Sequence, residues 1–474
     1  MTQTSRQMLQ GVGRYVQEFG IETSPTPETA PEASMAQLQR AFNETNGMLL
    51  FDGWVRVTNM VDCHLNCIPH AYVGARNGGF AVGPDFNMDD VSVLRMRNDF
   101  WASVGPFRPW FGAQIGDFGF TFDQSDAAVS GNRADLTEYP RAIGFVGNGV
   151  RPKFRHIYMA NAWDGIIADG NQGGADIDHI EAGCFNRAVF FDRVAPNPKG
   201  SKDFIRIGML HKWQFGWGES ANLATLHQSN LTVALYVGDV DGFGIDNLVV
   251  HGGDVFVNNP NALAVGEGAP YPNPVPTPGE PFQPGSFIPH QFGRVKMDTT
   301  NSTFHWQRGW GAVRGYSSQH RMLVTGGTLT LSTPSFNVLN GPAVSVVGGK
   351  CHITGGSIYV RQNRNYASPA QAVGMSVSES GTLSVKGMLA EAGPNMASFE
   401  RNAPIFDQLG ENAALRISEI DVPDTTPGSA PIVRIGTDNT KNYVNAQSMR
   451  YRPPQLPASR PLGNYITPHG VWGE

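Results

Sequence analysis

The sequence predicts an all-β fold, an elongated parallel β-helix. Three observations support this: the composition, an internal repeat, and the alternation of apolar residues within each copy of the repeat. Gly accounts for 56 and Pro for 33 of the 474 residues, and only 16% of the residues are charged. Long helices need runs of Ala, Leu, Glu and Lys, and such runs are nearly absent. Short strands joined by turns at Gly, Asn, Asp and Pro fit this composition.

The repeat consists of a short apolar strand, a Gly corner, and a second strand or its beginning. Gly at the corner lets the backbone turn sharply without a Cβ clash. A weaker fifth copy at residues 415–420 has lost the Gly. The four clear copies occupy residues 248–257, 322–331, 351–360 and 383–389.

Equivalent apolar residues recur at intervals that are typical of solenoids, propellers and other repeat arrays. The intervals run from Ile157 to Ile180 (23 residues), Val324 to Ile353 (29), Ile353 to Val385 (32) and Val385 to Ile417 (32). A propeller blade would need four strands and a period of about 40–50 residues. Copies stacked at the strand spacing of roughly 4.8 Å would instead align their apolar residues in columns. We therefore expect Val250, Val324, Ile353 and Val385 to point inward.

Three regions differ in pattern along the chain. Residues 1–47 form an N-terminal attachment segment, with short helices expected at 2–19 and 35–43 and a Pro/Ser/Thr/Glu linker at 23–34. Residues 48–422 form the β-helix, interrupted by a Pro-rich loop at about 260–289 that cannot supply ladder hydrogen bonds. Residues 423–474 form an extended C-terminal cap, whose last part, 451–474, we expect to lie on a neighbouring subunit.

Composition also excludes several functional classes. A net charge of −6 and a pI near 6.1, without a Lys/Arg block, argue against nucleic acid as a partner. No apolar stretch approaches the roughly 18 residues of a membrane span, and the first 20 residues lack the apolar core of a signal peptide. We expect synthesis in a host cytoplasm without a signal peptide, no membrane insertion, and delivery by a virion.

The four cysteines are too few for a disulfide scaffold. Cys184 and Cys351 lie in apolar strand patterns and are expected to be small buried residues. Cys63 and Cys67 lie close to His64 and His70, but their C-x3-C spacing is unusual for zinc and no second half follows. We therefore expect free thiols, no metal site and no cofactor.

Five further segments carry a resemblance to a known family. They are residues 139–145, 154–158, 162–166, 173–178 and 183–188. Together with the repeat they resemble the pectate-lyase-like β-helix domains of phage and prophage tailspikes, over roughly residues 110–420. The resemblance implies a right-handed single-stranded parallel β-helix and a homotrimer attached through its N-terminus to other virion proteins. It also implies recognition of capsule, O-antigen or exopolysaccharide, and it leaves attachment to a tail or to a capsid open.

Glycan binding needs flat aromatic faces for sugar C–H groups and polar forks for hydroxyl or carboxylate groups. Two clusters combine these features and are interpreted as facing outward, with subunit packing as the alternative. The first contains Trp213 and Trp217, and the second contains Trp306, Arg308, Trp310, Arg314 and Tyr316.

Catalysis by a glycosidase would need two carboxylates at a defined separation. Asp239 with Asp241, and Asp176 with Asp178, are two residues apart and are candidate pairs. Because Asp beside Gly is also ordinary turn chemistry, catalysis stays open. A lyase would need a base beside Arg, and His305 with Arg308 is the one weak cluster of that kind.

The sequence therefore indicates a virion spike or fibre subunit that binds a bacterial surface polysaccharide, with depolymerase activity left open. The first alternative is a non-catalytic structural fibre or a capsid or tail decoration protein. The second is a free bacterial polysaccharide hydrolase or lyase.

Overall fold

The computed structural model describes the chain in segments. They are residues 13–64, 67–71, 77–97, 114–146, 152–168, 175–191, 205–213, 220–228, 231–238, 243–257, 290–297, 303–306, 310–318, 321–338, 342–360, 374–391, 405–409, 412–422, 433–435, 443–447, 450–451, 465–467 and 470–472. These segments are mostly β-strand, and nearly all of their strands pair in parallel. The described residues fall into two compact units, one ending at Gly253 and one beginning at Asp254.

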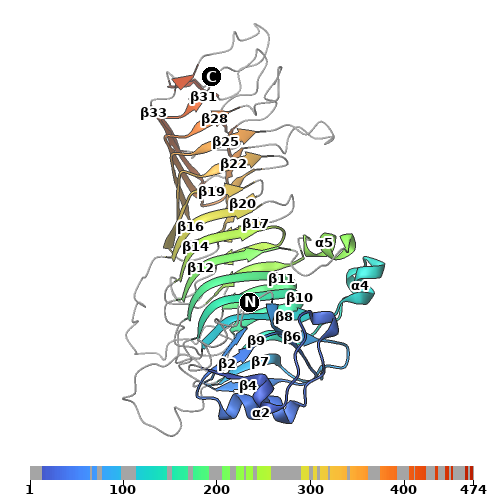
Figure 1. Ribbon diagram of the computed structural model, residues 1–474. Helices are drawn as coiled ribbons and strands as arrows, with labels where there is room; N and C mark the ends of the chain where they lie inside the picture. The colour runs from blue at the N-terminus through green and yellow to red at the C-terminus, as the bar shows by residue number, and fades with distance from the viewer. Residues whose placement is uncertain are drawn as a thin grey trace, which may run out of the picture. The chain divides into compact units, whose positions relative to one another are not determined.

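Unit 1 holds the helices and the longest strands (Figure 1). Its strands are β1 (Gly13–Tyr15), β2 (Gly47–Phe51), β3 (Trp54–Val57), β4 (Val61–His64), β5 (Cys67–Ala71), β6 (Gly79–Val82), β7 (Ser92–Arg97), β8 (Gln114–Phe122), β9 (Arg141–Val146), β10 (Lys153–Ala168), β11 (Ala175–Phe191), β12 (Ile205–Lys212), β13 (Val233–Val237) and β14 (Phe243–Val250). Its helices are η1 (Val16–Phe19), η2 (Pro27–Thr29), α2 (Met35–Glu44), α4 (Ser125–Ser130), η4 (Arg133–Asp135) and α5 (Ala221–His227).

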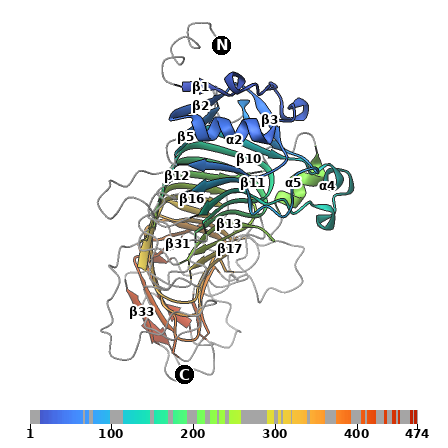
Figure 2. The ribbon, with the colours of Figure 1, turned by 90° about the horizontal axis from the view of Figure 1, so that it is seen from below.

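The N-terminal part of unit 1 packs against strands. Helix α2 confirms the expected helix at 35–43; Ser34 caps it by accepting the backbone N–H of Gln37. The expected helix across 2–19 is wrong at Gly13–Tyr15, where β1 pairs in parallel with β2, and within the described residues only the short 3-10 helix η1 (Val16–Phe19) is helical. A Cβ added at Gly13 would lie 2.8 Å from the carbonyl oxygen of Met48, so this close strand contact requires Gly. Figure 2 shows α2 beside β1, β2 and β5.

The expected linker also lies against a strand. The backbone N–H of Ser24 donates to the carbonyl of Trp54 at 2.9 Å, and the N–H of Trp54 donates back at 2.6 Å. Further along, the N–H of Arg56 donates to the carbonyl of Pro31 at 2.9 Å. Residues 24–31 are thus tied to β3 by backbone hydrogen bonds.

Strands β8, β10, β11, β12 and β14 form the main parallel ladder of unit 1. Its apolar residues align in two buried columns, and the second column confirms the expected equivalence of Ile157 and Ile180. The columns are Ile115, Phe154, Ile177, Ile207 and Ile245, and Phe118, Ile157, Ile180, Leu210 and Leu248. All ten side chains are at most 2% exposed.

Strands β10 and β11 are long because each passes through two ladders. The second half of β10 pairs with β9, and the second half of β11 pairs with β13. The register shifts between Met159 and Ala162, and Asn161 between them has a φ of 57°. Asn is one of the few residues that adopt this left-handed conformation readily.

Unit 2 contains mostly short strands (Figure 1). They are β15 (Asp254–Val257), β16 (His290–Met297), β17 (Thr303–Trp306), β18 (Trp310–Arg314), β19 (Tyr316–Ser318), β20 (Arg321–Val324), β21 (Thr328–Ser332), β22 (Ser335–Val338), β23 (Val344–Val346), β24 (Lys350–Thr354), β25 (Ser357–Val360), β26 (Met375–Val377), β27 (Thr382–Lys386), β28 (Leu389–Glu391), β29 (Phe406–Gln408), β30 (Ala414–Ser418), β31 (Asp421–Val422), β32 (Val433–Ile435), β33 (Tyr443–Gln447), β34 (Arg450–Tyr451), β35 (Tyr465–Thr467) and β36 (Gly470–Trp472).

From β17 to β31 each strand pairs in parallel with the third strand after it, giving three ladders. Strands β32, β33 and β34 continue these ladders past residue 422, where the sequence analysis placed their end. Within 451–474, β35 and β36 form an antiparallel pair. The Pro-rich loop lies outside the described residues.

The expected inward residues are buried: Val250 and Val324 are 0%, Ile353 is 1% and Val385 is 2% exposed. Cys184 and Cys351 are buried free thiols, as expected, and Cys63 and Cys67 are also buried and free. No helix within the described segments is both long and apolar enough to cross a membrane.

The predicted alignment of two copies is wrong by one strand. Ile353 pairs with Leu331, 22 residues earlier, and not with Val324, which pairs with Val346. Both segments contain a strand, two Gly residues and a second strand, so the motif alone could not distinguish two successive corners. The later pairs, Ile353 with Val385 and Val385 with Ile417, are as expected.

One corner of unit 2 has a left-handed backbone in five successive repeats. The residues at this corner are Gly315, Thr333, Gly355, Gly387 and Glu419, with φ between 50° and 70°. At the first four of these corners, the backbone N–H donates to the carbonyl of the residue just before the equivalent corner of the following repeat, at 2.7–3.1 Å. Glu419 stands where the fifth copy has lost its Gly, so the ladder keeps the corner even when a side chain must occupy it.

We predict that Leu329→Cys forms a disulfide with native Cys351, because these residues are register partners on adjacent strands. Adjacent strands lie roughly 4.8 Å apart, within the usual Cα separation of about 4.4–6.8 Å for disulfides. Met322→Cys, the partner that the sequence alignment selects, should stay reduced. Mass spectrometry after mild oxidation detects the disulfide in either variant. A disulfide in Met322→Cys, with none in Leu329→Cys, would contradict the register.

We predict that Gly315→Ala destabilises the protein, because φ is +64° and nothing lies within 4 Å of the added Cβ. The left-handed backbone alone should then cost about 1–2 kcal/mol. Glu419→Gly should shift stability the other way, since the exposed Lys386–Glu419 ion pair that it removes is worth little. Thermal unfolding midpoints measure both, and shifts of equal sign would contradict the strain argument.

Candidate functional site

The main ladder of unit 1 presents a polar face opposite its buried columns. In each strand two residues, not one, separate the two buried positions, as Arg155 and His156 do between Phe154 and Ile157. The ladder register therefore places polar residues of different strands side by side. One row contains Asp117, His156, His179, Met209 and Asn247, and the next contains Tyr158, Glu181 and His211.

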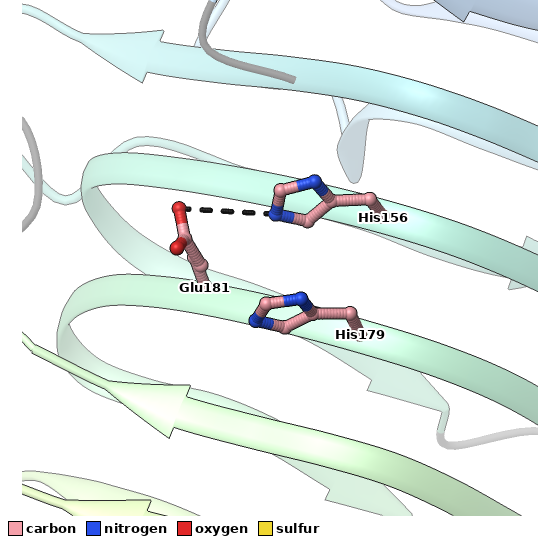
Figure 3. A group of neighbouring side chains, drawn as sticks. All are labelled: His156, His179 and Glu181. Atoms are coloured by element: carbon pink, nitrogen blue, oxygen red, sulfur yellow. Dashed lines mark ion pairs between the residues drawn. The ribbon is translucent and has the colours of Figure 1, made fainter. Parts of the chain in front are cut away.

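Two histidines and a glutamate converge on this face (Figure 3). The rings of His156 and His179 are stacked, with centroids 4.4 Å apart and planes 14° apart. Nε2 of His156 lies 3.8 Å from Oε2 of Glu181. One ligand atom from each residue lies within 4.8 Å of the others. All three side chains are partly buried, with His156 27% and Glu181 12% exposed.

A second histidine–carboxylate pair flanks this group. Nε2 of His70 lies 3.6 Å from Oδ2 of Asp117, and the backbone N–H of Asp117 donates to Nδ1 of His70 at 3.3 Å. Burial lowers the pKa of His70, while the Asp117 carboxylate acts in the opposite direction. Asp117 is also the register partner of His156.

Aromatic groups continue the face beyond β12. The Trp213 ring packs edge-on against His251 with centroids 3.9 Å apart, and His211 lies 5.5 Å from His251. The backbone N–H of Trp213 donates to the carbonyl of Ala182 at 3.1 Å, which extends the ladder past β12. Trp213 is half-buried.

The opposite end of the same strands is charged and exposed. Arg206 lies 3.2 Å from Asp176, 3.0 Å from Asp246 and 3.9 Å from Asp178. The hydrogen bond to Asp176 is the main cause of the raised pKa of Arg206. Asp176 and Asp178, the described candidate catalytic pair, therefore share one guanidinium in a surface ion-pair network.

The second predicted glycan cluster is corrected by burial. Trp306 and Tyr316 are 0% exposed and pack around Phe304, so their rings cannot face outward. Arg314 is exposed at the end of β18. His305 pairs with Asp254 at 3.2 Å. Asp239, Asp241, Trp217, Arg308 and the side chain of Trp310 lie outside the described residues.

Sequence reasoning missed His156, His179 and Glu181 as a group. The signal was the repeated His-Ile pair, because Ile157 and Ile180 had already been aligned. The alternation rule would have placed the histidines on the outer face, but only the observed register brings Glu181 into range of His156.

A groove of about 380 Å³ lies near α4, away from this polar face. Its walls include Glu28, Arg56, Asp123 and Asn161. Nε of Arg56 donates to Asp85 at 3.1 Å, and Asp123 accepts the backbone N–H of Ser125 at 3.0 Å. Two of its charged side chains are thus already engaged in local structure.

No family model, curated protein or solved structure matches this chain.

A lysine is buried beneath this face. Lys212 is 0% exposed, and its Nζ donates to the carbonyl of His227 and, at 3.3 Å, to Oγ1 of Thr232. His227 in turn pairs with Oδ1 of Asn161 at 3.1 Å and stacks on Phe185. Burial lowers the pKa of Lys212 from 10.5 to about 7 and also lowers the pKa of His227.

We predict that Lys212→Met stabilises the protein most at or below pH 7. In wild type the unfolded state keeps the lysine proton up to its pKa of 10.5, whereas the folded state releases it near pH 7. Wild-type stability should therefore rise between these values by up to about 1.4 kcal/mol per pH unit. The advantage of Lys212→Met should shrink over the same range. The free energy of unfolding of wild type and of Lys212→Met, measured from pH 6 to 10, gives this difference, and exposed Lys350→Met is the control. A stability difference between wild type and Lys212→Met that does not change with pH would contradict the prediction.

Proposed function

We propose that the chain is a subunit of a virion spike or fibre that binds a bacterial surface polysaccharide. In this proposal the parallel ladders belong to a right-handed single-stranded β-helix. The regular pairing of strands β17 to β31 with the third strand after each supports this arrangement. Homotrimer formation and attachment to other virion proteins through the N-terminus belong to the same proposal.

The glycan would bind along the polar face of unit 1. The observation that carries this assignment is the half-buried Trp213 on the same strand ladder as the exposed Arg206 ion-pair network. Aromatic faces pack against sugar C–H groups, and the exposed carboxylates of this network can accept hydrogen bonds from sugar hydroxyl groups. Arg206 and Trp213 are seven positions apart in the sequence, which corresponds to at most about 23 Å of extended strand. That length favours an extended polymer over a small ligand.

We predict that Trp213→Ala weakens binding to polysaccharides extracted from a panel of bacterial strains and immobilised on a surface. Loss of one packed ring should cost roughly 1 kcal/mol, which is about a fivefold loss of affinity. The exposed Arg321→Ala on unit 2 serves as the control and should bind as wild type does. If Trp213→Ala binds the polysaccharides as tightly as wild type and Arg321→Ala do, the assignment of glycan binding to this face is wrong.

The same preparation separates the alternatives. A structural fibre or decoration protein would bind none of the polysaccharides. A hydrolase would release new reducing ends during incubation, and a lyase would release unsaturated products. Binding without either product supports a recognition protein that does not cut its glycan.

A further inference from the structure

We propose that His156, His179 and Glu181 bind one Zn²⁺ ion on the polar face of unit 1. Zinc binding at this site does not require a polysaccharide, so its test is independent of the proposed function. Its three donors lie within 4.8 Å of one another (Figure 3). Zn–N bonds of about 2.0–2.1 Å in a tetrahedral site place two donors about 3.3 Å apart. Closing that difference requires the two imidazoles, whose planes are 14° apart, to rotate out of their stack so that both nitrogens point at the ion.

The backbone places the three donor residues on two adjacent strands. His156 and His179 are register partners on adjacent parallel strands, and so are Tyr158 and Glu181. The residues that follow the two histidines, Ile157 and Ile180, are both 0% exposed and anchor the strands in the core. The stacking of the imidazoles brings their nitrogens to the same side, facing the carboxylate of Glu181 (Figure 3).

One of the three donor groups, the Nε2 atom of His156, lacks, within the described part of the chain, a hydrogen bond that a metal ion would have to displace. Nε2 of His156 is shielded from solvent, yet it has no hydrogen-bond partner among the described residues and only the 3.8 Å ion pair with Glu181. A shielded polar atom without a hydrogen bond is costly. A metal–nitrogen bond would satisfy it. Asp117, beside His156 in the register, adds negative charge close to the ion.

The donor set selects the metal. Two imidazoles and one carboxylate suit zinc and similar transition metals, whereas Ca²⁺ and Mg²⁺ prefer oxygen ligands. Three protein ligands leave the fourth position of a tetrahedral ion open, as in catalytic rather than structural zinc sites. Water or another small donor can occupy that position from the partly exposed side.

The chain supplies its own matched control. On β17, His305 stacks on Phe256 with centroids 4.2 Å apart and lies 3.2 Å from Asp254. This group repeats the stacked ring and the histidine–carboxylate pair, but Phe replaces the second imidazole. It should not hold zinc in the same way.

The test is a calorimetric titration of EDTA-stripped, dialysed full-length protein with ZnCl₂. Wild type should bind one ion at this site. His156→Ala and Glu181→Gln should each weaken that event by at least about 100-fold, because losing even outer-shell partners costs 10–100-fold. His305→Ala should leave it unchanged. Thermal unfolding verifies folding, and Glu181→Gln keeps the shape of the side chain it replaces.

Two further readouts test the assignment. Co²⁺ in place of Zn²⁺ should give the intense visible absorption of a four-coordinate ion, and His156→Ala should abolish it. Excess Ca²⁺ or Mg²⁺ should not displace zinc. Equal zinc binding by wild type, His156→Ala and Glu181→Gln would overturn the proposal and assign the binding to other histidines.

Discussion

The structure depends on parallel strands that pair in strict register. Once backbone hydrogen bonds align neighbouring strands, each residue has a fixed partner on the next strand, and side chains of one kind collect in columns. The column through Phe118, Ile157, Ile180, Leu210 and Leu248 forms part of the core of unit 1. The same alignment determines the positions of the corners and of the polar face. A register shift would therefore disturb the core, the corners and the polar face together.

The ladder overrides local preference where the two conflict. Thr333 and Glu419 adopt the left-handed backbone that Gly occupies at the same corner in other repeats. Their conformation is unfavourable for a residue with a Cβ, but the paired strands on both sides of the corner require it, and at Thr333 the hydrogen bond to Thr354 adds to the constraint. Lys212 is a parallel case: its strand position points it inward, and buried carbonyl and hydroxyl acceptors meet its amine.

Function follows from the same geometry on the outer side. Two histidines 23 residues apart become stacked neighbours because their strands pair, and a glutamate two residues beyond the second completes the group. A single difference separates it from the group on β17, where Phe256 occupies the stacked position. Binding chemistry on such a face therefore depends on which residues share a row, and segments far apart along the chain can contribute to one site.

The sequence by itself determined the strand-rich class, the Gly corners, the helix at 35–43 and the burial of Val324, Ile353 and Val385, because composition and alternation act locally. It also selected Trp213, Asp176 and Asp178. Only the tertiary structure decided that Ile353 pairs with Leu331, that Trp306 and Tyr316 are interior, and that His156, His179 and Glu181 meet. Those outcomes depend on which strands pair. Because the loops between repeats differ in length, the spacing of residues in the sequence does not predict which strands are partners.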